Sequence, residues 1–329
     1  MNARLKTFAW LVKREFWEHK VMLVWAPLCV AAAMLVFLIA ASAFSARSGV
    51  ENLEAMVKES TFSSAVSSDH KAAAPQLSVA RPQKVTAAGV FGFVLPLFVL
   101  LAITIFFYCV QTLYDERKNR SVLFWKSLPV SDASTVIAKV FTAAVAAPLF
   151  NLCVGLGISV VIALFFAMLS SFAGQYSLWT ELGKAEFYLL PVYFLAAFPV
   201  FVFWALPTLG WLLLVSSVAR TAPLFWAVSI PILFGAIQLG LNQFGNFNWD
   251  VKWYWINIVG RGLGAVMPGS WYWPGDPSAP FRIGTPDAMH QMLNVAWAQF
   301  ELWTMWVGIF VGVAMIYLAI RVRRWKDEG

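Results

Sequence analysis

Six long apolar runs limit what this chain can fold into. They cover roughly 21–45, 88–113, 137–169, 188–218, 222–241 and 302–320. A transmembrane helix needs about 20 apolar residues to cross a hydrocarbon core of about 30 Å. The sequence therefore predicts an all-α membrane protein with six transmembrane helices, which form a single domain over residues 1–329.

The composition agrees with a membrane protein and excludes other classes. Hydrophobic residues make up 60% of the chain and charged residues 12%, against about 45–50% and about 25% in a soluble domain. That balance excludes an ordinary soluble enzyme, a disordered chain and a nucleic-acid-binding protein. The three cysteines, Cys29, Cys109 and Cys153, lie in apolar runs without metal-ligand spacing, so we expect neither a disulfide framework nor a metal site.

The distribution of basic residues predicts the orientation in the membrane. Six spans place both termini on one side, and fifteen of the 24 Lys and Arg residues fall in the short segments on that side. Cytoplasmic loops carry the excess of Lys and Arg. We therefore expect both termini in the cytoplasm and the two long loops, 46–86 and 242–301, outside.

Residues 4–20 predict an amphipathic helix that lies in the cytoplasmic membrane interface. A plain cytoplasmic extension of the first span is the alternative. The expected apolar face consists of Leu5, Phe8, Ala9, Val12 and Phe16. The aromatic residues assigned to the interface are Phe8, Trp10, Phe16 and Trp17.

The second external loop is dense in aromatic residues. Five Trp and two Tyr fall between 249 and 273. Several glycines and Pro268 make one uninterrupted helix unfavourable there, so short helices are expected between spans five and six, in or dipping into the outer leaflet. A surface aromatic belt and a ligand-binding role are both open for this region.

Charged residues and histidines are absent from the middle of every predicted span. Intramembrane ionisable groups mark proton relays and ion sites, so a proton-driven transporter or a pump is disfavoured. The strongest polar residues in the spans, Gln111, Asn151 and Gln238, predict helix–helix hydrogen bonds, with substrate contact as the alternative. No nucleotide-binding, zinc-protease or serine-hydrolase motif occurs, so we do not expect the chain to be an enzyme.

The segment 114–131 is the most specific stretch of the sequence. It starts with charged residues and continues with apolar and aromatic ones, although it falls in a cytoplasmic loop. The excess of basic residues explains its charges but not its apolar side chains. An exposed apolar cluster with a charged rim is typical of a docking contact. Ser131 is expected to cap the following helix, with Asp132 in its first turn.

The stretch from Leu113 to Ser131 resembles the loop after the second span in ABC-2 type permease subunits of bacterial ABC transporters. An amphipathic N-terminal helix, six spans and external helices between spans five and six are similar to that family's plan. In the family this loop contains a cytoplasmic coupling helix that docks onto a separate ATPase subunit. The residues that the resemblance assigns to docking are Asp115, Glu116, Arg117, Arg120, Phe124, Trp125, Lys126, Leu128 and Pro129.

The resemblance also implies partners and a location. A permease domain of this kind pairs with a second permease subunit and with two ATPase subunits, which bind ATP and Mg, in the bacterial inner membrane. The chain itself would hold no cofactor and would export an amphipathic compound such as a lipid, a peptide or a drug-like molecule. The alternatives are a membrane scaffold or sensor subunit that recruits a cytoplasmic partner, and a lipid-modifying enzyme, for which no catalytic constellation is seen.

Overall fold

The computed structural model describes residues 3–44, 47, 94–119, 130–172, 177–183, 185–245, 249–272 and 286–326. Every regular element in these ranges is helical. Six helices are long and apolar enough to cross a membrane: Val21–Phe44, Leu95–Lys118, Asp132–Phe172, Pro191–Val218, Pro223–Gly245 and Trp303–Trp325. The predicted all-α class and the six spans are confirmed at this level.

The labelled elements follow one another along the chain with few long connections. They are α1 (Ala3–Glu18), η1 (Val21–Trp25), α4 (Leu95–Lys118), α6 (Asp132–Phe141), η2 (Thr142–Ala146), α7 (Ala147–Phe172), α8 (Ser177–Leu182), α9 (Ala185–Val218), α10 (Pro223–Gly245), α11 (Val251–Tyr254), η3 (Trp255–Gly260), α12 (Arg261–Gly264), η4 (Ser270–Tyr272), α13 (Pro286–Ala298), η5 (Gln299–Glu301) and α14 (Trp303–Lys326). The short elements η1, η2 and η3 are π-helical, and η2 joins α6 to α7 without a break.

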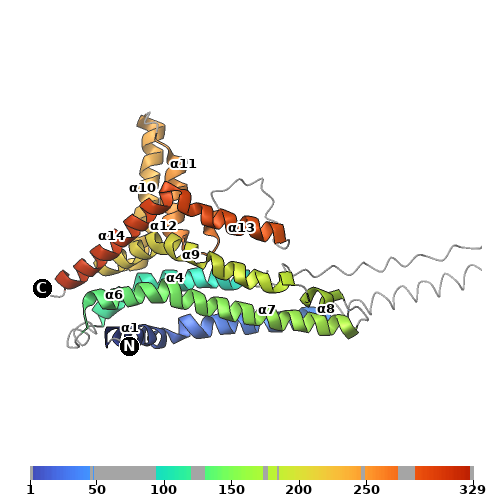
Figure 1. Ribbon diagram of the computed structural model, residues 1–329. Coiled ribbons are helices and arrows are strands. Elements are labelled where there is room, and N and C mark those ends of the chain that lie inside the picture. The colour runs from blue at the N-terminus through green and yellow to red at the C-terminus, as the bar shows by residue number, and fades with distance from the viewer. Residues whose placement is uncertain are drawn as a thin grey trace, which may run out of the picture.

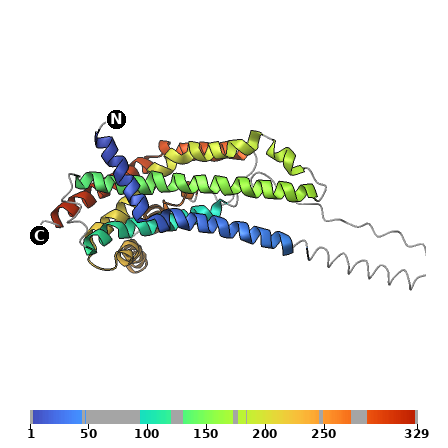
Figure 2. The same ribbon diagram turned by 90° about the horizontal axis from the view of Figure 1, so that it is seen from below.

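Most of the long helices run side by side, and α10 departs from them. The span Val21–Phe44, α4, α7 and α9 have roughly parallel axes, while α1 crosses them obliquely (Figures 1 and 2). The helix α10 rises steeply from this group in Figure 1 and is seen almost end-on in Figure 2. The helix α1 and the C-terminal end of α14 lie at the same end of the bundle, which we call the terminal end.

The helix α9 is the centre of the packing. It contacts α4, α10, α12, α13 and α14, and it remains one helix through its three prolines. Its closest neighbour is α14, where Gly210 faces Gly312. A Cβ at Gly210 would lie 2.5 Å from the carbonyl oxygen of Gly312, so these two backbones meet without intervening side chains. Small residues allow this approach between helices in a membrane.

One of the three predicted polar contacts within the spans is present. The Asn151 side chain donates from Nδ2 to the carbonyl oxygen of Leu97 at 3.1 Å, which joins α7 to α4 and confirms the structural interpretation for this residue. Gln111 is exposed, and the buried Oε1 of Gln238 has no hydrogen-bond partner within the described part of the chain.

The helix ends at the terminal end follow local sequence signals. Ser131 caps α6 as predicted, because its Oγ accepts from the backbone N–H of Ser134 at 3.1 Å. Asp132 lies in the first turn of α6, and Arg117 lies in the last turn of α4, where each charge complements the helix dipole. The third span therefore begins at Asp132, five residues before the predicted 137.

The region between α10 and α14 consists of short helical pieces, as predicted. Asp250 caps α11 by accepting from the N–H of Trp253 at 2.9 Å. The Tyr254 hydroxyl donates to the carbonyl oxygen of Pro231 at 2.9 Å, and Trp204 donates from Nε1 to Ser270 Oγ at 3.1 Å. These bonds hold the segment 249–272 against α10 and α9.

Candidate functional site

Six charged side chains from four helices meet at the terminal end. We call them the ion-pair network: Arg14, Glu15, Glu116, Asp132, Lys139 and Arg323. They come from α1, α4, α6 and α14, and three carboxylates balance three cations. Residues that are far apart along the chain are thus joined by charge at one end of the bundle.

The Glu15–Lys139 pair is the most buried part of the network. The Glu15 side chain is 0% exposed and the Lys139 side chain 1%. Lys139 Nζ lies 2.9 Å from both carboxylate oxygens of Glu15, 2.9 Å from Thr112 Oγ1 and 2.8 Å from Glu116 Oε1. The Tyr108 hydroxyl donates to Glu15 Oε2 at 2.9 Å.

The local charges keep Glu15 ionised. Burial alone would raise the pKa of this carboxyl, but Lys139 and Arg14 together lower it from 4.5 to about 2. Burying an ion pair costs desolvation free energy, which only good geometry and further hydrogen bonds recover. Both conditions are met here, so the pair fixes α1 against α4 and α6 in one arrangement.

Arg323 connects the two helix ends that flank the segment 119–131. Its Nη1 lies 2.6 Å from Glu116 Oε2, near the end of α4, and its Nε lies 3.2 Å from Asp132 Oδ1, at the start of α6. Arg117 holds the same end of α4 to α9, because its Nη2 donates to the carbonyl oxygens of Ser216 and Ala219. The predicted docking segment is therefore fastened at both ends.

The structure describes three of the nine predicted docking residues. Asp115 is half-buried, while Glu116 and Arg117 make the internal contacts just given. The other six, Arg120, Phe124, Trp125, Lys126, Leu128 and Pro129, lie outside the described residues, and so does the predicted coupling helix. Their role in docking stays a prediction.

The four residues assigned to the membrane interface divide into two pairs. Phe8 packs on Phe141 with ring centroids 5.6 Å apart, and Phe16 packs on Phe150 at 5.8 Å. Trp10 and Trp17 are exposed. The most buried residues of α1 are Leu11 and Glu15, so the packed face is turned slightly from the expected one, which began at the exposed Leu5.

A small group of possible metal ligands adjoins the network. Glu15, Glu18 and His19 each offer a ligand atom, and these atoms lie within 4.8 Å of one another. The Glu15 carboxylate already accepts from Lys139, Arg14 and Tyr108, which leaves it poorly suited to a metal ion. Burial lowers the pKa of His19, so this imidazole is neutral at pH 7.

Sequence reasoning missed the network, although two signals for it are present. Glu15 follows Leu11 by four residues and therefore lies on the packed stripe of α1, where a carboxylate requires a partner. Lys139 falls inside the apolar run 137–169, where a cation has the same need. Neither signal identifies the partner, because the pairs are more than 100 residues apart in sequence.

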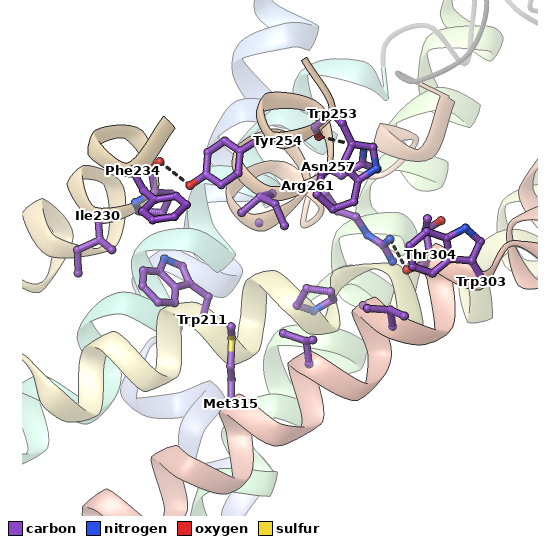
Figure 3. Close-up of a pocket in the computed structure, with 17 residues that line it drawn as sticks. Trp211, Ile230, Phe234, Trp253, Tyr254, Asn257, Arg261, Trp303, Thr304 and Met315 are labelled. Atoms are coloured by element: carbon purple, nitrogen blue, oxygen red, sulfur yellow. Dashed lines mark hydrogen bonds between the residues drawn. The ribbon is translucent and has the colours of Figure 1, made fainter. Parts of the chain in front are cut away.

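A cavity of about 440 Å³ lies between α9, α10, the η3–α12 segment and α14 (Figure 3). Aromatic side chains line much of it, among them Trp211, Phe234, Tyr254 and Trp303, and Arg261 lies in its wall. The cavity is thus made in part from the aromatic region that the sequence left open as a belt or a ligand site.

Comparisons of the chain with protein-family models, with curated proteins and with solved structures found no match.

Proposed function

We propose that this chain is the transmembrane subunit of an ABC transporter of the ABC-2 permease type, which exports an amphipathic compound with energy from separate ATPase subunits. The observation that carries the proposal is the double fastening of the segment 119–131. Arg323 bonds Glu116 before this segment and Asp132 after it, and Lys139 ties both sides to α1 through Glu15.

This arrangement supports energy coupling because a displaced segment would move several helices together. Ion pairs with little exposure resist separation, since an unpaired buried charge costs several kcal/mol. A push from a docked ATPase would therefore pass from 119–131 to α1, α4, α6 and α14 as a unit. The absence of charged residues from the middle of the spans fits a subunit that receives its energy from a partner.

The proposed complex contains two ATPase subunits with ATP and Mg, and a second permease, identical or paralogous, in the bacterial inner membrane with both termini in the cytoplasm. Apolar side chains on α10 support a second permease or lipid as a neighbour, because Phe225, Leu233, Phe234 and Ile237 are exposed. The exposed Phe310 and Tyr317 extend this apolar surface to α14.

Transport into inverted membrane vesicles tests the proposal. With both subunits and ATP present, a labelled lipid or peptide cargo should accumulate, and the double variant Trp125→Asp/Leu128→Asp should abolish both accumulation and co-purification of the ATPase. The matched control Trp125→Phe/Leu128→Ile keeps the side chains apolar and should retain both. Normal ATPase binding without movement of any candidate cargo would favour the scaffold or sensor subunit instead.

A further inference from the structure

The cavity between α9, α10 and α14 contains a cation without a carboxylate partner. Arg261 begins α12 and lines the cavity. Within the ranges that the structure describes, no carboxylate lies within ion-pair distance of it, whereas Arg14 and Arg323 both have carboxylate partners. Burial lowers the pKa of Arg261 to about 10, which leaves the guanidinium charged at neutral pH.

The guanidinium is held in place without being neutralised. Its Nη1 donates to the carbonyl oxygen of Thr304 at 2.8 Å, its central carbon lies 3.9 Å from the Trp204 ring centroid, and its Nε has no acceptor. A Cβ at Gly308 would lie 2.5 Å from Nη2, so glycine at that position makes room for the arginine. A fixed cation with a spare donor in a partly buried site favours an anion.

The rest of the cavity suits a hydrocarbon chain. Trp303 lies beside the Arg261 end and Met315 at the other (Figure 3). These two residues are twelve positions apart on α14, or about 18 Å along the helix axis. Trp211 and Phe234 line the space between, and the exposed Ile230 and Val311 at its rim make the same surface accessible to lipid. The volume lies within the ordinary range for a ligand site.

We propose that this cavity binds one anionic membrane lipid, whose headgroup lies at Arg261 and whose acyl chain runs between α10 and α14 toward Met315. Charge complementarity identifies the occupant, because a neutral lipid or an apolar face of a second copy would leave the guanidinium without an anion. Exposed Trp253 and Trp303 at the Arg261 end match the aromatic residues that lie at headgroup level in membranes. The site does not depend on ATP-driven transport, so it can be tested on the purified chain alone.

Native mass spectrometry of the full chain from neutral detergent measures this binding directly. The probe is dioleoylphosphatidylglycerol, and dioleoylphosphatidylcholine, which has the same chains and no net charge, is the comparison. We expect one tightly retained phosphatidylglycerol, at least tenfold weaker binding in Arg261→Gln, and partial recovery in Arg261→Lys. The control Lys252→Gln removes a nearby exposed charge outside the cavity and should leave binding unchanged.

A second variant tests the chain-binding part without removing the charge. Gly262 lines the cavity, and a Cβ there would meet no atom within 4 Å, so Gly262→Leu adds volume to the cavity. It should lower phosphatidylglycerol binding, while Gly240→Leu on α10, which is equally open but outside the cavity, should not.

Three results would overturn the proposal. They are equal retention of the two lipids, full retention in Arg261→Gln, and a change in the monomer–dimer ratio without a change in bound lipid. The last would mean that a second copy covers the cavity. Thermal midpoints of the variants identify any that fail to fold, and Gly262→Leu and Arg261→Lys then carry the test.

Discussion

Arg323 on the last helix lies 2.6 Å from Glu116 at the end of α4, with 207 positions of chain between them. The same guanidinium reaches Asp132 at the start of α6, so one side chain joins the two helix ends that enclose the segment 119–131. The last span is thereby connected to the segment that we propose as the ATPase contact.

Removing this cation should loosen the terminal end. In Arg323→Met, Asp132 loses its ion-pair partner and Glu116 loses one of its cations, and the free energy of unfolding should fall by about 3–5 kcal/mol. Unfolding by SDS in mixed micelles measures the change. The neighbouring Arg324 is exposed, so Arg324→Met should leave stability within about 0.5 kcal/mol of the wild-type chain.

The same variant should separate ATPase binding from transport. The apolar residues proposed to dock are unchanged in Arg323→Met, so the ATPase should still co-purify. Because the segment is no longer tied to α14, cargo moved per ATP hydrolysed should fall several-fold in reconstituted vesicles. An unchanged ratio would mean that Arg323 has only a structural role.

The buried Glu15–Lys139 pair should behave as a unit. Lys139→Met leaves Glu15 buried with only Arg14 as its cation, and the free energy of unfolding should fall by about 3–5 kcal/mol. In the double variant Glu15→Leu/Lys139→Met no unpaired charge is left in this pair, so much of the loss should be regained. Additive losses in the two single variants and the double variant would show that the residues do not interact.

Glu15 should also give the protein an acid-sensitive stability. Its pKa is lowered from 4.5 to about 2 by Lys139 and Arg14, so the folded state holds this carboxyl ionised at lower pH than the unfolded state does. Its contribution is complete above pH 4.5 and is lost as the pH falls from 4.5 toward 2. Thermal midpoints across this window should fall less steeply in Glu15→Gln, and identical slopes would contradict the assignment.

The close approach of α9 and α14 should tolerate no side chain. A Cβ at Gly312 would lie 2.6 Å from the backbone carbon of Leu206, so Gly312→Ala should push the helices apart and cost about 1–3 kcal/mol. Gly157 on α7 has no atom within 4 Å of a Cβ, and Gly157→Ala should be neutral or stabilising by up to about 1 kcal/mol. The same SDS titration compares both.

Sequence reasoning predicted the spans well because local hydrophobicity determines them. The Ser131 cap and the broken helices after α10 were also readable, since cap residues and glycines act within a few positions. The partners of Glu15 and Arg323 were not, because they depend on which helices become neighbours. The steep inclination of α10 was not predictable either, since hydropathy gives the length of a span and no angle.

The cavity at Arg261 was only half visible in the sequence. The aromatic residues between 249 and 273 indicated a belt or a ligand site. The isolation of one arginine from every carboxylate in the described ranges emerges only when α12 is packed against α9 and α14. Thr208 fixes this packing by donating from Oγ1 to the carbonyl oxygen of Arg261 at 2.8 Å.

Site-specific photo-crosslinking from position 125 tests the proposed ATPase contact most directly. With a benzophenone amino acid in place of Trp125, irradiation of native membranes should join this chain to a protein that binds and hydrolyses ATP. The adduct should disappear when Leu128→Asp is added. Adducts formed only with lipid, or only with a protein that binds no nucleotide, would contradict the proposal that the segment 114–131 docks an ATPase.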